Sequence, residues 1–125
     1  MKYNFEVYHK NTMVFHSDSH WLHPIFEFES FIETNSIDPE TLKVHDKIIG
    51  RAAALLLVRL GIRQIHAGLL SELGKEVLLH SQVNFSFNKL VNQIGCQTET
   101  LLKDEYDPQE AYRLIKEHIA KAKSE

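Results

Sequence analysis

The chain has few of the residues that would mark an unusual architecture. Its 125 residues include one cysteine, three prolines and five glycines, so an internal disulfide is impossible and no linker or low-complexity tract divides it. It also lacks the run of ~20 apolar residues that a membrane span requires, and no apolar segment near its start resembles a signal peptide. We therefore expect a single cytoplasmic domain over residues 1–125, with no membrane as a partner.

The chain also lacks an excess of positive charge. Its 14 Lys and Arg residues are outnumbered by 17 Asp and Glu residues, which gives a formal net charge of −3. A generic nucleic-acid-binding protein gains affinity from a surplus of cations that face the phosphates. The whole-chain balance thus predicts no nucleic-acid partner. The rest of the composition, 43% hydrophobic and 25% charged, is that of an ordinary globular domain and excludes a disordered chain.

The start of the chain predicts a hairpin followed by a helix. Alternating polar and apolar residues indicate an N-terminal β-hairpin with strands at residues 3–9 and 13–16. A helix is expected to begin near residue 19 and to present one apolar stripe. The stripe consists of Trp21, Ile25, Phe28 and Ile32. Phe26 and Phe31 lie off the stripe, and we treat them as a candidate homodimer interface.

The strongest feature of the chain is an apolar segment at residues 46–60, which predicts a helix buried on nearly every side. Asp46 suits its N-cap, because the carboxylate can accept hydrogen bonds from the free amides of the first turn. Gly61 suits the left-handed residue just past its end. We expect this helix to lie at the centre of the fold.

Strands and helices alternate around this central helix. Strands are expected at residues 42–45, 62–69 and 83–87, and helices at residues 72–80, 90–94 and about 108–122. Ser71 is the expected cap of the helix at 72–80, and Asp107 with Pro108 begins the last one. Alternation implies parallel strands joined by right-handed crossovers. The predicted fold class is α/β: a three-layer α/β/α sandwich whose mixed, mostly parallel sheet has about five strands and includes the N-terminal hairpin.

One motif carries a family resemblance. The string from Asp46 to Ala54 follows the pattern D-K-x-x-G-x-A-A-A, and it resembles the signature of a small bacterial family of unknown function. That family is similar in fold to cytidine deaminases. The resemblance covers roughly residues 3–100 and reaches Cys96 and Glu99, with Gln97 where the family tends to have proline. It implies a cytidine-deaminase-like sandwich to which the C-terminal helix has been added.

The residues exclude the zinc chemistry of such deaminases. That mechanism needs a His or Cys ligand with a glutamate two residues later, together with a P-C-x-x-C pair. None of the eight histidines is followed two residues later by glutamate, and one cysteine cannot supply the pair. We therefore expect no metal site and no cofactor.

The predicted fold places a candidate site at the carboxyl ends of the parallel strands, where ligands bind in open α/β sheets. Helix N-termini at this edge point free amides outward and attract anions. The residues at the edge would be His45, Asp46 and Lys47 after one strand and Ser71 and Glu72 after the next. We treat them as candidate ligand-binding groups.

Two cations complete this candidate site. Lys47 and Arg51 lie four residues apart on the predicted central helix and so share a face. Between residues 47 and 71 the chain has four basic residues and no acidic one. The leading hypothesis is therefore a binding or sensing domain for a small anionic, nucleotide-like ligand. In the alternative interpretation, Asp46 is only a helix cap and the two cations only extend into solvent.

Two other functional classes stay open. An enzyme of unidentified reaction would use Asp46 or Cys96 in the same cleft, with Cys96 as a nucleophile or redox-sensitive thiol. A free cysteine is also common as a small buried apolar residue, which would give Cys96 no chemical role. In the third class, a non-catalytic domain has an empty pocket and uses its C-terminal helix for assembly.

Overall fold

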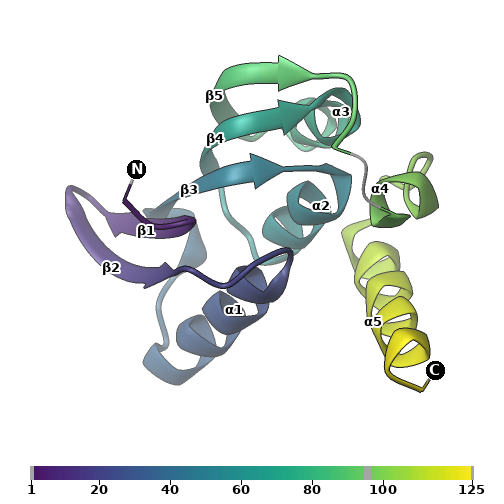
Figure 1. Ribbon diagram of the computed structural model, residues 1–125. Coiled ribbons are helices and arrows are strands. Elements are labelled where there is room, and N and C mark those ends of the chain that lie inside the picture. Colours follow the sequence, from purple (N-terminus) through teal and green to yellow (C-terminus); the bar gives the residue numbers. More distant parts are fainter. Residues whose placement is uncertain (1, 95–96, 125) are drawn as a thin grey trace.

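Strands and helices alternate along most of the chain (Figure 1). The computed structural model describes residues 2–94 and 97–124. The strands are β1 (Phe5–His9), β2 (Thr12–Ser17), β3 (Leu42–Ile49), β4 (Gln64–Ser71) and β5 (Asn84–Val91). The helices are α1 (His23–Asn35), the 3-10 helix η1 (Pro39–Thr41), α2 (Arg51–Arg59), α3 (Glu72–His80), α4 (Gln97–Leu101) and α5 (Pro108–Ser124). None of the described helices is long and apolar enough to cross a membrane.

The five strands form one mixed sheet in the order β2-β1-β3-β4-β5. The N-terminal hairpin is confirmed as β1 and β2, which pair antiparallel. β1 also pairs antiparallel with β3, whereas β3, β4 and β5 run parallel to one another. Half of the four pairings are thus antiparallel, and the prediction of a mostly parallel sheet is wrong. The reason is that β1 lies inside the sheet, where it has an antiparallel neighbour on each side.

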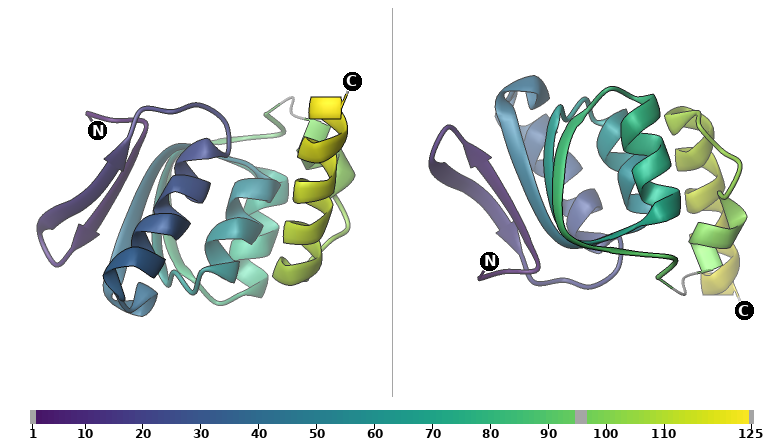
Figure 2. Two further views of the ribbon diagram at one scale, coloured as in Figure 1. Left: turned by 90° about the horizontal axis from the view of Figure 1, so that it is seen from below. Right: turned by 90° about the horizontal axis from the view of Figure 1, so that it is seen from above.

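The helices lie on one face of the sheet (Figure 2). The connections β2-α1-β3, β3-α2-β4 and β4-α3-β5 each join parallel strands and each step in the same direction across the sheet. Right-handed crossovers that step the same way leave their helices on the same face. α4 and α5 lie beyond α2, which contacts both. The layers are therefore the sheet, then α1 to α3, then α4 and α5. The predicted sandwich, with helices on both faces, is not found in the described residues.

α2 is the buried centre of the fold, as predicted, but it is shorter than expected. Seven consecutive residues of this helix, from Arg51 to Leu57, are buried. The helix begins at Arg51 because the preceding residues belong to β3, where Asp46 pairs with Phe5 and with Ala67. Gly50, not Asp46, occupies the N-cap position. An apolar segment of this length fits a buried strand and a buried helix equally well, so periodicity could not separate the two.

Two other boundaries also differ from the prediction. α1 begins at His23 rather than near residue 19, because Trp21 has a φ of 60° that no right-handed helix can contain, while Pro24 suits the first turn. The short helix expected at residues 90–94 is wrong: Leu90 continues β5 and pairs with Leu70 of β4.

The caps of the later helices are confirmed. The Ser71 hydroxyl accepts a hydrogen bond from the Gly74 amide at 3.0 Å and begins α3. The Asp107 carboxylate accepts from the Gln109 amide at 3.0 Å at the start of α5. Gly61 has the expected left-handed conformation after α2, with a φ of 89°.

The two off-stripe phenylalanines of α1 have partners within the chain. Phe26 makes an edge contact with Tyr112 of α5, with ring centroids 6.5 Å apart. Phe31 packs on Phe15 of β2 at 5.2 Å. Arg59 of α2 adds a guanidinium 3.6 Å from the Tyr112 ring, which ties α5 to the central helix. These contacts account for both phenylalanines without a second subunit, and the homodimer stays a prediction.

Two left-handed residues should respond oppositely to substitution. Gly61→Ala should lower the free energy of unfolding by about 1–2 kcal/mol, because a Cβ is strained at this positive φ. The added Cβ itself would meet only Pro39, at an ordinary 3.6 Å. Ser36, the C-cap of α1, has a φ of 51°, so Ser36→Gly should raise stability by about 1 kcal/mol. Urea unfolding measures both, and equal shifts of one sign would contradict the argument.

Candidate functional site

A pocket of about 320 Å³ lies beside the carboxyl end of β3. Its lining comes from β3, from the loop between β2 and α1, from the start of α2 and from α4. The lining residues are Asn4, Ser19, His20, Trp21, Leu22, Pro24, Asp46, Lys47, Ile48, Gly50, Ala52, Ala53, Thr98 and Glu99. This volume is within the range of small-molecule sites. The pocket is therefore large enough for a small organic ligand.

Asp46 is a titratable group of this pocket. It lies on the helix-covered face of β3, because its strand neighbours Phe5 and Ala67 belong to the core. The carboxylate accepts one long hydrogen bond, from the Ile48 amide at 3.4 Å. Burial raises the pKa of Asp46 to about 7, and the backbone amides of Ile48 and Lys47 offset this only in part. Near neutral pH the group therefore exists in both protonation states.

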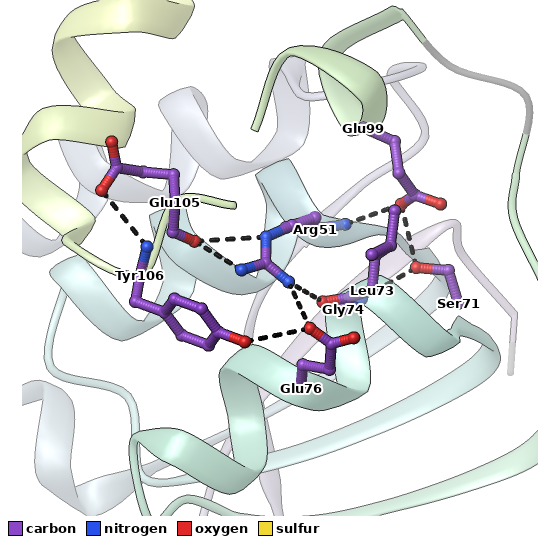
Figure 3. Close-up of polar contacts among 8 residues, drawn as sticks. All are labelled: Arg51, Ser71, Leu73, Gly74, Glu76, Glu99, Glu105 and Tyr106. Carbon is purple, nitrogen blue, oxygen red and sulfur yellow. Dashed lines mark hydrogen bonds and ion pairs between the residues drawn. The ribbon is translucent and has the colours of Figure 1, made fainter. Parts of the chain in front are cut away.

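The Glu99 carboxylate joins the N-termini of two helices (Figure 3). Its Oε2 accepts from the Arg51 amide at 2.8 Å, at the start of α2, and from the Ser71 hydroxyl at 2.9 Å. Ser71 in turn accepts from the Gly74 amide in α3. Oε1 accepts from the Ile94 amide at 3.3 Å. A carboxylate of the chain thus occupies the position at which these helix ends would attract an external anion.

Gly50 makes room for this carboxylate. A Cβ at residue 50 would lie 2.6 Å from the Glu99 Oε2 and would also collide with the Ile94 side chain. Any larger residue would push α4 away from the start of α2. The glycine in the D-K-x-x-G-x-A-A-A pattern is therefore needed for a close approach of two elements.

Arg51 is a buried structural cation (Figure 3). Its guanidinium donates to the Glu105 carbonyl from Nε at 3.2 Å and Nη2 at 2.7 Å, and to the Leu73 carbonyl at 2.8 Å. It also forms an ion pair with Glu76 at 3.2 Å and lies 4.6 Å from the Tyr106 ring. The side chain thus ties the segment between α4 and α5 to α3. Its hydrogen-bonding capacity is used within the protein.

The structure separates the residues that the sequence grouped at one edge. Lys47 lines the pocket from β3, while Arg51 is buried in α2, so the two do not share a helix face. Ser71 is a buried cap and Glu72 is exposed at the start of α3. His45 alternates with Asp46 along β3 and so lies on the opposite face of the sheet. Only Asp46 and Lys47 of the predicted set line the pocket.

Cys96, the other catalytic candidate, lies outside the described residues. In residues 2–94 and 97–124, no group of three or more His, Cys, Asp or Glu side chains could hold a metal ion.

Sequence reasoning missed the roles of Trp21 and Glu99. Trp21 fits the apolar stripe of an amphipathic helix, and only its positive φ reveals that it lies before α1 at the pocket. Glu99 is the only acidic residue between residues 77 and 103, which marks it as unusual. That signal names no partner, because Arg51 and Ser71 lie 48 and 28 residues away along the chain.

A protein-family model described as "TM1506: Domain of unknown function (DUF1893)" matches residues 2–119. The chain belongs to this family. The DUF1893 match extends over most of α5. The fold is also similar to the crystal structure of a DUF1893 family protein (TM1506) from Thermotoga maritima, with a TM-score of 0.82 and 23% sequence identity. That similarity covers 92% of this chain and 80% of the other. No curated protein matches the chain.

Substitution of the two predicted ligand cations should separate their roles. Arg51→Ala should lower the free energy of unfolding by about 3 kcal/mol or more, because it removes a fully buried side chain together with the hydrogen bonds that it donates to the Glu105 and Leu73 carbonyls. Lys47→Ala should leave stability almost unchanged, since the side chain is exposed. Urea unfolding of both variants checks this. A stable Arg51→Ala protein would show that the buried network is not needed.

Asp46 should give the protein a pH-dependent stability that Asp46→Asn removes. The pKa of the carboxyl is about 7 in the folded protein and near 3.8 when unfolded, so the folded state holds the proton more tightly between these values. This contribution is full at about pH 4 and is lost as the pH rises through 7. The stability of the parent relative to Asp46→Asn should therefore fall between pH 4.5 and pH 7.5 and then level off. A constant difference in urea unfolding across this range would contradict the raised pKa.

Proposed function

We propose that this protein binds a nucleoside or nucleotide in the β3 pocket and does not carry out zinc-dependent deamination. The observation that carries the proposal is that the pocket combines the aromatic ring of Trp21 with the Asp46 carboxyl group. We also propose that the fold is a relative of the cytidine-deaminase fold in which the described helices cover one face of the sheet.

Trp21 offers a stacking surface for a planar ring. Its side chain is 46% exposed although it lines the pocket, so the indole remains accessible to a ligand. The backbone is in the left-handed region, which a bulky residue rarely adopts. Such strain persists only where the surrounding structure holds it, and it is frequent at ligand sites. Stacking on an aromatic side chain is worth about 1–3 kcal/mol per nucleobase.

Asp46 offers hydrogen bonds to the edge of such a ring. A protonated carboxyl both donates and accepts, and the ionised form accepts only. Nucleobase edges present donors and acceptors side by side. With its pKa raised to about 7, Asp46 can match either pattern at neutral pH. This versatility favours a nucleobase over a simple anion at the base of the pocket.

The charge of the pocket favours a ligand that is more than a phosphate. Glu99 occupies the amide at the start of α2, and Arg51 is directed into the protein. Lys47 is the remaining cation among the predicted ligand groups and is exposed beside the pocket. A phosphate of a nucleotide could pair with Lys47 while the base occupies the pocket. The sequence predicts a small anionic ligand. We propose that the pocket recognises this ligand mainly through its planar ring and less through its charge.

A second candidate function is acid–base catalysis by Asp46. A general acid or base acts best when its pKa is near the working pH, and Asp46 meets that condition inside a pocket. Turnover of a bound nucleoside, followed by chromatography of the products, would favour this function over binding alone. The assembly hypothesis has less support, because α5 already packs against α2 and buries Ala111 and Ile115.

Calorimetric titration with nucleosides, nucleoside monophosphates and inorganic phosphate tests the proposal. We expect at least one nucleoside to bind, and phosphate alone not to bind. Trp21→Ala should weaken nucleoside binding by about tenfold or more, because it removes the stacking surface. Asp46→Asn should weaken it and alter its pH dependence.

Matched controls make this test specific. Leu101 is also 46% exposed but lies outside the pocket, so Leu101→Ala should bind like the parent. Asp104 is exposed and outside the pocket, so Asp104→Asn controls for the loss of one carboxylate. No binding of any nucleoside or nucleotide at millimolar concentration would refute the proposal. Binding that survives both pocket substitutions would place the ligand elsewhere.

A further inference from the structure

The face of the sheet that none of the described helices covers carries a row of polar side chains that crosses all five strands. The strand register pairs His16 with Glu6, Glu6 with His45, His45 with His66, and His66 with Ser86. Residues paired directly across strands lie on the same face of a sheet. The described helices all lie on the other face (Figure 2). This row, with its neighbours along each strand, is called here the open face.

Aromatic rings follow one another across the open face. Tyr3 stacks on His16, with ring centroids 3.9 Å apart and planes at 13°. Tyr8 lies 5.0 Å from His45, and His45 lies 5.4 Å from His66. The His66 Nδ1 is 2.7 Å from the Ser86 hydroxyl, which fixes the orientation of that ring. The rings are therefore arranged as a series from β2 to β4.

The carboxylate beneath these rings is used within the chain. Glu6 is 2% exposed, and it accepts from the Lys2 and Tyr3 amides at 3.0 Å and from the Tyr8 hydroxyl at 2.9 Å. These hydrogen bonds lower its pKa against the effect of burial. Glu6 thus positions two of the rings and presents almost no negative surface to a partner.

The charge of the open face differs from that of the whole chain. The five strands contain only Glu6 and Asp46 of the 17 acidic residues, and Asp46 faces the helices. Lys43 lies two residues before His45 on β3, and strand alternation places both on one face. The Lys2 ammonium lies 5.4 Å from the centre of the Tyr3 ring. The acidic residues are concentrated in the helices and loops. The exposed charged side chains beside the rings, Lys2 and Lys43, are thus basic although the net charge of the chain is −3.

We propose that the open face binds single-stranded nucleic acid. Unpaired bases stack on exposed aromatic rings, and their phosphates pair with nearby cations. A broad sheet face cannot enter the grooves of a duplex as a helix does, so single strands fit it better. Side-chain amides of Gln64 and Asn84, paired in the row beside the histidines, add hydrogen bonds suited to bases. This proposal is independent of the pocket on the other side of β3.

Fluorescence anisotropy at low salt tests the proposal. The probes are a labelled 20-nucleotide oligouridine and an oligothymidine of the same length. We expect binding that weakens steeply as salt is added. Lys43→Glu should weaken it by about tenfold or more, because a cation beside the rings becomes an anion. His45→Ala should weaken it by removing a central ring. Asp46→Asn should leave it unchanged, which separates this face from the pocket.

Lys103→Glu is the matched control. It changes the net charge by the same amount as Lys43→Glu, at an exposed residue between α4 and α5. The control should change affinity by less than about twofold. Circular dichroism and thermal unfolding establish that each variant is folded. Absence of oligonucleotide binding, or equal losses in Lys43→Glu and Lys103→Glu, would overturn the proposal. Displacement of the oligonucleotide by polyglutamate at equal charge concentration would also overturn it and would indicate an acidic protein partner.

Discussion

The direction in which the chain crosses the sheet is the constraint on which the rest of this structure depends. From β2 onward, each crossover joins parallel strands and moves one way, so α1, α2 and α3 accumulate on one face. A fold with helices on both faces needs a reversal of that direction, and the described chain has none. The second helical layer, α4 and α5, packs on α2. One consequence is a helix that is buried over most of its length, and another is a sheet face that none of the described helices covers.

When helices pack on helices in this way, backbone amides and carbonyls at their ends become buried. Glu99 and Arg51 supply hydrogen-bond partners for these groups. The start of α2 is enclosed by α3, α4 and the segment before α5, so water cannot reach its first amide. Glu99 accepts from that amide, and Arg51 donates to carbonyls of the surrounding segments. Buried charges of this kind are tolerated because each is paired or fully hydrogen-bonded. Both residues are hydrogen-bonded within the chain, so neither is free to bind a ligand at this sheet edge. For this reason our proposal assigns ligand binding to Trp21 and Asp46.

The sequence predicts those parts of the fold that local chemistry decides. Four predicted features depend only on neighbouring residues, and all are confirmed. They are the caps at Ser71 and Asp107, the left-handed conformation of Gly61 and the N-terminal hairpin. The boundary between β3 and α2 depends on pairing with β1 and β4, which lie elsewhere in the chain, so an apolar run could not locate it. The placement of Arg51 was wrong for that reason. The Glu99 contacts span long stretches of chain, and spacing rules do not extend that far.

Net charge is an average over the whole surface, whereas a binding partner meets one face. Alternation along β3 shows how far the two can differ: Asp46 faces the helices and the pocket, while Lys43 and His45 lie on the other face of the strand. One short segment therefore supplies an acidic group to one environment and basic groups to another. A value of −3 for the chain describes neither. Strand alternation can be predicted from sequence, but the predicted strand ended at residue 45 and assigned Asp46 to a helix. Because β3 in fact continues to Ile49, Asp46 and His45 point to opposite faces of the sheet. The separation of charge between the two faces depends on this boundary.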